Sequence, residues 1–282
     1  MNERQQEADY AVLQRLMVNL VQSQAGRPIK LGQAWLNDAQ TLARKMFEHL
    51  ASLRVLTNVI RVEIDESHSF EFIDHSSVKV VARAAFETYL VFFFIFSGSD
   101  RSLSEFRHKI WRYGGLADRQ KSHPATAEAR DIQAAEKVEM DRLKPEIEAS
   151  PHLGAYSRDA ARKILKGEWR GSDSWAVLSR YAGFHESYFR DTYGYLCGYS
   201  HASYISAMQV GQAQLLDDQR KLTSMCIGIG LALMAHFARA YTELFGDTNL
   251  FLDADREAKA AVDRWSFSAE EWAKVIAKQS AC

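Results

Sequence analysis

The stretch VKVVARAAFETYLVFFFIF, residues 78–96, decides the fold class of this chain. It is apolar nearly all the way round a helix, and such a helix must be buried in a protein core or in a membrane. Arg83 and Glu87 stand near its middle, where a charge is costly in a bilayer. We therefore expect a buried core helix that begins at Asp74 or Ser76, and no membrane insertion.

Helical spacing of apolar residues extends along most of the chain, and only 4 of its 282 residues are proline. The principal helices are expected at residues 3–24, 31–60, 74–96, 102–113, 125–149, 175–200 and 215–245. Residues 62–72 alternate apolar with acidic side chains, which fits either an extended connector or a small hairpin. The sequence therefore predicts an all-α fold, a bundle of seven to nine helices.

One part of this bundle differs in composition. Residues 125–149 are helical in pattern but dense in alternating charge, with few large apolar side chains. Residues 151–173 have the weakest pattern and fit long loops around a short helix at 157–166. We expect a single helical domain over residues 1–282, in which residues 115–173 form an exposed insertion or arm with one long charged helix.

Charge and cysteine content narrow the class of protein. The chain has 35 Lys and Arg against 36 Asp and Glu, so its composition does not favour nucleic-acid binding. Cys197, Cys226 and Cys282 are odd in number and lack metal-type spacing, which disfavours disulfides and structural zinc. The charged start MNERQQEADY is unlike a signal peptide. We expect a cytoplasmic protein in a reducing compartment.

A second apolar stretch, MCIGIGLALMAHFARAY at residues 225–241, approaches the length of a membrane span. His236 and Arg239 stand near its end, and its apolar residues follow the amphipathic spacing of a core helix. We expect this segment, too, to be buried in the protein.

The helix at 74–96 carries one narrow polar stripe. Ser76, Lys79, Arg83 and Glu87 follow one another at steps of three or four residues and therefore share a face. One interpretation is a solvent-facing edge, whose exposed Arg83–Glu87 ion pair contributes less than about 1 kcal/mol. The other is an internal polar pocket, because buried charges are costly unless they are paired and usually serve a purpose.

The segment RDTYGYLCGYSHAS, residues 190–203, is the most unusual in composition. Its small-residue face combines four positions at helical spacing: Gly194, Cys197, Gly198 and His201. An aromatic stripe runs beside this face: Tyr188, Tyr195 and Tyr199. Each helical glycine costs about 1 kcal/mol relative to alanine, so two on one face indicate either close packing or a groove. We expect the face to touch the 74–96 helix and to bring His201 into one buried network with Arg83 and Glu87; the alternative is a tightly packed core histidine.

Two short motifs resemble a known family. The R-A-x-x-E motif at residues 83–87 and the later Y-x-x-L-C-x-Y-S-H-x-S segment are similar to motifs of a family of bacterial all-helical proteins of unknown function. That family has an R-A/S-x-x-E helix followed by an L-S-x-x-x-H segment. Leu196 and His201 match, and Cys197 stands where the family often has serine. The resemblance extends over about residues 40–245 and implies an Arg–Glu–His cluster in the core, without a known activity.

A second class to consider is the HEPN-type metal-independent ribonucleases, which act as toxins or phage-defence effectors and carry an R-x4-6-H motif. Arg180 and His185 fit this spacing, and a general base beside a cation suits a scissile phosphate. Three further pairs also fit, so the pattern alone discriminates little: Arg44–His49, Arg61–His68 and Arg101–His108.

Motifs for metals and cofactors are missing from the sequence. A di-metal carboxylate site needs two Glu-x-x-His helices, and only Glu105 with His108 fits. Phosphate-loop, dinucleotide, zincin and hydrolase-elbow motifs do not occur. We therefore expect no cofactor and no metal.

Two functional hypotheses follow. The first is an intracellular binding or regulatory protein that takes an unknown protein or small-molecule ligand through Arg83, Glu87 and His201. The alternative is a HEPN-type ribonuclease, under which RNA is the ligand and Arg180 with His185 is the weaker candidate pair. Whether the chain is an enzyme, and whether it forms a homodimer, are left open.

Overall fold

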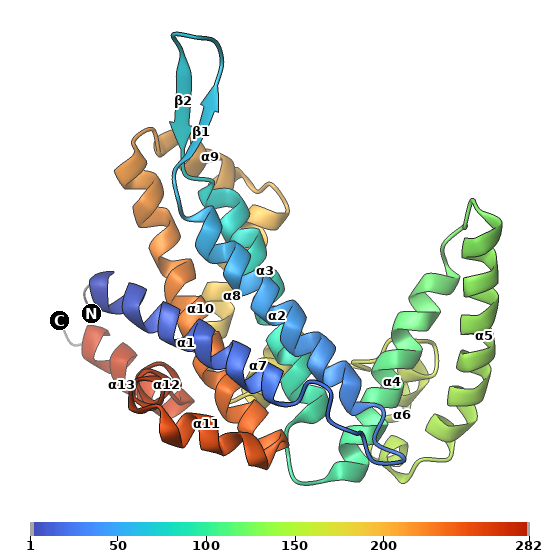
Figure 1. Cartoon of the computed structure of the whole chain (residues 1–282). Helices are drawn as coiled ribbons and strands as arrows, with labels where there is room; N and C mark the ends of the chain where they lie inside the picture. The colour runs from blue at the N-terminus through green and yellow to red at the C-terminus, as the bar shows by residue number, and fades with distance from the viewer. Residues whose placement is uncertain (1–2, 281–282) are drawn as a thin grey trace. The chain divides into compact units, whose positions relative to one another are not determined.

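The computed structural model describes residues 3–280 and confirms the all-α class, with 75% of the chain in helices (Figure 1). The first helices are α1 (Glu3–Ser23), α2 (Leu36–Leu56), α3 (His75–Phe96), α4 (Arg101–Gln120), α5 (Ala127–Glu148) and α6 (Arg158–Ile164). The remaining helices are α7 (Trp175–Tyr181), α8 (Glu186–Ser200), α9 (Tyr204–Gln212), α10 (Leu216–Leu244), α11 (Asn249–Ala254), α12 (Arg256–Trp265) and α13 (Ala269–Ser280). Two 3-10 turns lie at Pro151–Ala155 and Gly246–Thr248.

The described residues form thirteen α-helices, more than the seven to nine expected. The predicted helix at 175–200 is divided into α7 and α8, because Gly183 takes a left-handed φ of 82° and His185 then begins a new helix as its N-cap. Helix α9 was not expected, since its nine residues have no clear apolar period. It begins because the Ser203 side chain accepts a hydrogen bond from the Ser206 N–H.

Residues 62–72 belong to a hairpin rather than an extended connector. Strands β1 (Ile60–Glu63) and β2 (Ser69–Phe72) are antiparallel, with Ile60 opposite Phe72 and Glu63 opposite Ser69. Asp65 holds the turn by accepting hydrogen bonds from two backbone N–H groups within it.

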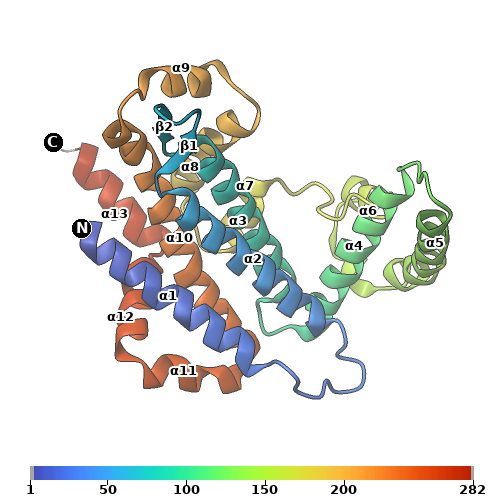
Figure 2. The same cartoon turned by 45° about the horizontal axis from the view of Figure 1, so that its top comes forward.

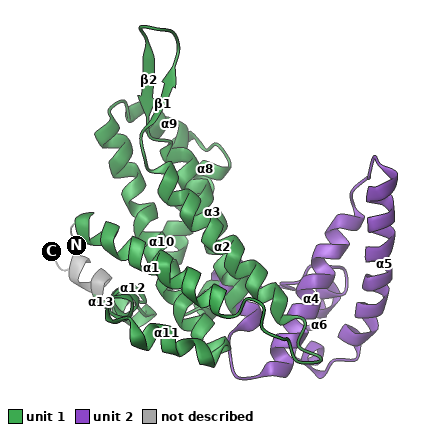
Figure 3. Cartoon of the chain, viewed as in Figure 1, with its two compact units in different colours: residues 1–93, 179–282 green, residues 94–178 purple. Residues whose placement is uncertain are grey.

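The chain divides into two compact units (Figure 3). Unit 1 comprises residues 1–93 and 179–282, and unit 2 comprises residues 94–178. Residues 115–173, expected as an exposed insertion in a single domain, lie within unit 2, which begins at Phe94.

Helix α10 is the central helix of unit 1 and packs against α1, α2 and α12 (Figure 2). Gly230 permits the close approach of α1, since a Cβ at this position would lie 3.0 Å from the Tyr10 ring. Tyr10 is buried and donates a hydrogen bond to the Leu50 carbonyl of α2 at 2.8 Å. Between α1 and α12, the Arg264 guanidinium donates to both carboxylate oxygens of Asp9.

Helix α3 is buried over most of its length, as its composition predicts. Phe92 lies against Phe237 and Tyr241 of α10, with ring centroids 5.1 and 6.4 Å apart. Burying aromatic side chains of this size contributes strongly to the stability of the unit 1 core.

Unit 2 has an apolar core of its own, to which α4, α5 and α6 contribute Phe106, Ile110, Tyr113, Ala117, Met140, Leu143, Ile147 and Ile164. The solvent side of α5 carries the alternating charges, where Arg142 is paired with both Glu139 and Glu146. Helix α5 is therefore amphipathic, with a narrow apolar face toward α4 and a broad charged face toward solvent.

One helix among the described residues, α10, is long and apolar enough to cross a membrane. Most of its apolar window is buried inside the protein, as in a core helix. The other stretch considered at the sequence level, in α3, does not meet the same criteria. Of the cysteines, Cys197 and Cys226 are free thiols, and Cys282 lies outside the described residues.

Candidate functional site

The polar stripe of α3 begins just after the helix cap. The Asp74 carboxylate accepts a hydrogen bond from the Ser77 N–H at 2.9 Å and holds the first turn. Two turns later, Arg83 Nε donates to Glu87 Oε1 at 2.9 Å. These two residues form an ion pair one helical turn apart, the geometry that favours such pairs on a helix.

Helix α8 lies against this part of α3 through an aromatic and a phenolic side chain. The Phe189 ring meets Phe86 edge to face, with centroids 5.5 Å apart. One turn later, the Tyr193 hydroxyl donates to Glu87 Oε1 at 2.6 Å and accepts from Arg83 Nη2 at 3.4 Å. The guanidinium carbon lies 5.3 Å from the centroid of the Tyr193 ring. Tyr193 therefore contacts both members of the ion pair.

His201 follows α8 as its C-cap residue, and its Nε2 lies 3.3 Å from Arg83 Nη1. The next residue, Ala202, has a left-handed φ of 51°, which is strained for a residue with a Cβ. This conformation belongs to a Schellman helix end, in which the Ser203 N–H donates to the Gly198 carbonyl at 2.9 Å. The structure thus places four residues, Arg83, Glu87, Tyr193 and His201, in one bonded group, which we call the Arg83 cluster.

The Arg83 cluster is not buried, which corrects the expectation of a sealed network. The side chain of Arg83 is 22% exposed, that of Glu87 is 28% exposed, and His201 is an exposed residue. The physical reason is the position of the stripe. At Arg83 and Glu87 a single tyrosine of α8, Tyr193, contacts the ion pair, whereas two tyrosine rings face Lys79 nearer the end of α8. The charges therefore keep part of their hydration.

Protonation within the cluster is set mainly by partial burial and by the neighbouring charges. Burial by itself lowers the pKa of Arg83, but the hydrogen bond with Tyr193 and the Glu87 carboxylate outweigh it and raise that pKa. Burial raises the pKa of Tyr193, and the hydrogen bond to Glu87 raises it further. Tyr193 is therefore a neutral phenol and Arg83 a permanent cation across the physiological range.

Lys79, the preceding polar residue of the stripe, has a different environment. It is fully buried, and its Nζ donates to the His75 carbonyl at 2.9 Å. The ammonium lies 4.2 Å from the ring centroid of Tyr199 and 5.7 Å from that of Tyr195. Burial lowers the pKa of Lys79 to about 8, and burial raises the pKa of the nearby Cys226 thiol to about 12. One end of the stripe is thus enclosed and the other is open.

The small-residue face of α8 does not pack closely against another helix, contrary to expectation. A Cβ added at Gly194 would meet nothing within 4 Å, and one added at Gly198 would meet Ser203 Oγ at 3.0 Å. Contact with α3 is made instead by the bulkier neighbouring face, through Phe189 and Tyr193. Tyr193 is therefore a cluster member that the sequence-level argument missed. Tyr193 stands four residues before Cys197, which stands four residues before His201, so helical spacing places Tyr193 near both. This spacing could have identified it.

In three of the four arginine–histidine pairs at ribonuclease spacing, at least one member is bonded to a residue outside the pair. Arg180 is exposed at the end of α7. His185 caps α8, since its Nδ1 accepts from the Ser187 N–H at 3.2 Å. Similar local partners bind Arg44 to Glu48, Arg61 to Glu63 and His68 to Asp65. The structure brings Arg83 together with His201, although the two are 118 residues apart in the chain.

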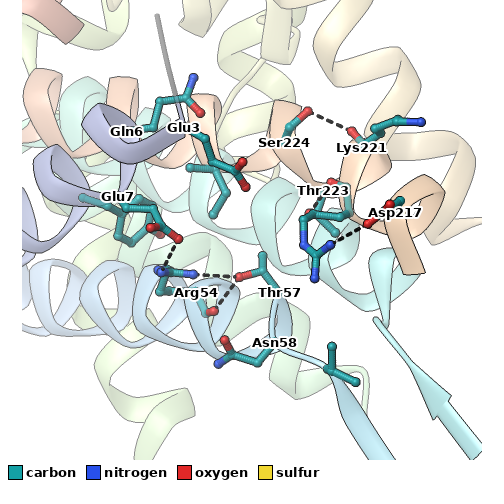
Figure 4. Close-up of a pocket in the computed structure, with 14 residues that line it drawn as sticks. Glu3, Gln6, Glu7, Arg54, Thr57, Asn58, Asp217, Lys221, Thr223 and Ser224 are labelled. Atoms are coloured by element: carbon teal, nitrogen blue, oxygen red, sulfur yellow. Dashed lines mark hydrogen bonds and ion pairs between the residues drawn. The ribbon is translucent and has the colours of Figure 1, made fainter. Parts of the chain in front are cut away.

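A cavity of about 780 Å³ lies elsewhere in unit 1, between the start of α1, the end of α2 and the start of α10 (Figure 4). Arg54 stands between Glu7 and Thr57 and bonds to both. Across the cavity, Arg220 pairs with Asp217. These cations are satisfied by carboxylates of the same lining, so the cavity presents a balanced polar surface without a concentrated charge.

Among the residues that the structure describes, no group of three or more His, Cys, Asp or Glu side chains is placed to hold a metal ion. Comparison with curated proteins and with solved structures gives no match. A family model described as a family of unknown function, DUF5677, matches residues 67–219, more than half of the chain. All four residues of the Arg83 cluster lie inside this match, whereas the cavity lining overlaps it only at Asp217. The chain belongs to the DUF5677 family, whose function is unknown.

Proposed function

We propose that the Arg83 cluster binds an oxyanion, the phosphate or carboxylate group of a small molecule or of a partner protein. The chain would then act as a cytoplasmic binding or regulatory protein. The observation that carries this proposal is the partly exposed guanidinium of Arg83 beside the exposed imidazole of His201. Such planar donor groups recognise oxyanions through paired N–H bonds.

The donor inventory supports the proposal. Arginine has five N–H donors. Nε–H is used by Glu87 and one Nη2–H by Tyr193. One Nη1–H points at His201 Nε2, which accepts it only when that nitrogen carries no proton, and the Nδ1–H of the ring is then the donor left for a ligand. Two further N–H groups of Arg83 have no partner among the described residues. Tyr193 and Glu87 fix the plane of the guanidinium, so little conformational entropy is lost when a ligand binds.

Charge limits the strength of this recognition. Glu87 already neutralises Arg83, so an anion gains little from net charge. The directed N–H groups of Arg83 therefore provide most of the binding.

The test uses histidine-ring NMR spectra of the full chain, with inorganic phosphate and acetate as separate probes. Phosphate should shift the His201 signal at concentrations in about the millimolar range. The shift should disappear in Arg83→Met, and the exposed His123 of unit 2 should not respond. A response to acetate but not to phosphate would indicate a carboxylate site. No response to either anion, or an equal one in Arg83→Met, would contradict the proposal.

A metal-independent ribonuclease is the second candidate, because one observation favours it. Cleavage of RNA needs a base for the 2′-hydroxyl and a cation for the phosphate, and the Arg83–His201 pair supplies both within 3.3 Å. RNA cleavage in the presence of EDTA should then be lost in His201→Ala and kept in His185→Ala. Absence of cleavage by the unaltered protein would exclude this candidate and leave the binding proposal standing.

A further inference from the structure

A row of guanidinium groups and aromatic rings lies within unit 2. The guanidinium carbon of Arg107 in α4 lies 4.4 Å from the centroid of the Phe94 ring, and the centroids of the Phe94 and Trp169 rings are 5.7 Å apart. The guanidinium carbon of Arg170 lies 5.9 Å from the centroid of the Trp169 ring and 4.6 Å from that of the Trp175 ring. We call these five residues the arginine–aromatic row. The rings hold both guanidinium groups in place, because the faces of aromatic rings attract cations.

The loop between α6 and α7 fixes the position of Arg170. Gly167 in this loop takes a left-handed φ of 96°, and a Cβ there would lie 2.6 Å from the Cβ of Ala117, so the loop lies directly on α4. The Asp173 N–H donates to the Arg170 carbonyl at 2.9 Å, and Arg170 Nη1 donates to the Asp173 carbonyl at 3.4 Å. A tightly held turn therefore presents Arg170, so little ordering is needed before this side chain binds a ligand.

Both arginines lack a carboxylate partner among the described residues. Arg107 Nη1 donates to the Phe94 carbonyl at 2.9 Å, and the Arg170 side chain makes only the long bond to the Asp173 carbonyl within the described part of the chain. Arg107 Nε is buried without a hydrogen-bond partner, so this charge is also partly removed from water. The described residues thus leave most N–H groups of the two guanidiniums unused. Four other arginines of unit 2 are each paired with a carboxylate: Arg112 with Glu139, Arg119 with Glu136, Arg142 with Glu139 and Glu146, and Arg162 with Asp159.

Asp173 supplies a carboxylate that both arginines of the row act on from a distance. Among the described contacts, no hydrogen bond or ion pair joins this carboxylate to Arg107 or Arg170. Burial raises the pKa of Asp173, and the charges of Arg107 and Arg170 offset only part of that rise. With Asp173 ionised, the three side chains still carry a net charge of +1. An anion is therefore attracted both by net charge and by directed N–H groups.

We propose that Arg107 and Arg170 together bind the phosphate group of a phosphorylated small molecule. One guanidinium can occupy both oxygens of a carboxylate, whereas the additional oxygens of a phosphate group can accept from a second guanidinium. The indole rings of Trp169 and Trp175 are half-buried and leave part of their surface open beside the guanidiniums. Because the base of a nucleotide stacks on such rings, a nucleotide is the favoured source of the phosphate. This proposal does not depend on anion binding at the Arg83 cluster.

The experiment follows the indole N–H signals of Trp169 and Trp175 by NMR in the full chain, with inorganic phosphate and adenosine monophosphate as separate probes. The Arg83→Met variant is used throughout, so that anion binding at the Arg83 cluster does not contribute. Both probes should shift the two signals with a Kd in about the millimolar range, and the nucleotide should bind more tightly because its base adds a stacking contact. Trp111 of α4 lies outside the row, and its signal is the internal control that should not respond.

Substitutions separate loss of binding from loss of folding. Arg107→Gln and Arg170→Gln should each weaken phosphate binding at least about tenfold. Arg142→Gln should leave the affinity unchanged, because Arg142 is already occupied by two glutamates. Asp173→Asn should bind phosphate several-fold more tightly, since it removes a carboxylate that repels the anion. A misfolded chain would not gain affinity in this way.

Three results would overturn the proposal: no shift of the Trp169 and Trp175 signals with either probe, unchanged affinity in the Arg107 and Arg170 variants, or an affinity in Asp173→Asn that does not rise. Equal affinities for the two probes would support the site and identify free phosphate as its ligand. None of these results bears on the Arg83 cluster, whose response at His201 is measured in the unaltered protein.

Discussion

Replacing Lys79 with methionine should stabilise the protein at neutral pH, and the gain should fade at alkaline pH. Lys79 is fully buried on α3, and no carboxylate is paired with it among the described contacts. Methionine has a similar length and no charge, so it fills the same space without an ion to desolvate. The exchange therefore isolates the free-energy cost of burying the ammonium.

The size of the effect follows from the pKa of Lys79, which burial lowers from 10.5 to about 8. Each unit corresponds to 1.36 kcal/mol, so burying the protonated form destabilises the folded state by about 3 kcal/mol. Contacts with the Tyr195 and Tyr199 rings offset part of that cost, since an aromatic face stabilises a cation by about 0.5–2 kcal/mol. We expect Lys79→Met to raise the free energy of unfolding at pH 7 by about 1–3 kcal/mol.

The sign of the pH dependence is fixed by which state binds more protons. Between pH 8 and 10.5 the unfolded lysine is still protonated, whereas the folded one has lost its proton. The stability of the unaltered protein therefore rises with pH through this window relative to the methionine variant. His75, Tyr195, Tyr199 and Cys226 also face Lys79, but they are present in both proteins, so most of their own titration cancels in the difference.

Denaturant melts at pH 7, 8, 9 and 10 measure this difference directly. Lys221→Met, at an exposed position of α10, is the control and should give a difference that does not change with pH. A constant difference for Lys79→Met across the same range would refute the reasoning. It would show that the tyrosine rings and the His75 carbonyl hold the pKa of the buried Lys79 at the value of a lysine in water.

Three other changes test the packing of unit 1. Glu87→Ala should cost about 1 kcal/mol in denaturant melts, not the 3–5 kcal/mol of a sealed pair, because the Arg83–Glu87 pair is partly hydrated; a loss above about 3 kcal/mol would mean that the cluster is closed in solution. Gly194→Ala should raise the free energy of unfolding by up to about 1 kcal/mol, because alanine favours a helix and its Cβ would meet no neighbour within 4 Å. A melting temperature below that of the unaltered protein would contradict the open face. Asp9→Asn should cost about 3 kcal/mol, because it leaves Arg264 without its carboxylate in a buried contact. Burial raises the pKa of Asp9, but hydrogen bonds from Trp265 and Arg264 outweigh burial and lower that pKa. The difference in free energy of unfolding between the two proteins should therefore shrink as the pH falls and Asp9 is protonated. A difference that does not change with pH would exclude the Asp9–Arg264 ion pair.

The all-α class followed from the sequence because apolar periodicity is a local property. The helix at 74–96 was predicted within one residue of its start and at its end, since a long apolar run bounded by Asp74 and Gly98 leaves few alternatives. Short elements were harder. Helix α9 depends on a Ser203 cap and on contacts such as Tyr199 to Gln209, which periodicity does not describe.

Burial within the polar stripe could not be predicted, because it depends on which residues of another helix cover each turn of α3. Lys79, Arg83 and Glu87 are each four residues apart, so the sequence places all three on one face of the helix. The structure places Tyr195 and Tyr199 over the first residue and a single tyrosine beside the other two. A buried ammonium and a solvated ion pair therefore lie on the same stripe.

Helix α8 determines both environments, and its end also places His201 beside Arg83. Its tyrosines enclose Lys79, its Tyr193 orients Glu87, and its C-cap His201 completes the cluster. Beyond His201 the helix closes in a Schellman motif, in which Ala202 takes the left-handed conformation and the Ser203 N–H donates to the Gly198 carbonyl at 2.9 Å. This helix end fixes where His201 stands beside Arg83, and Ser203 then caps α9. The position of the histidine in the cluster is therefore set by backbone bonds of the helix end, which the spacing of side chains in the sequence does not reveal.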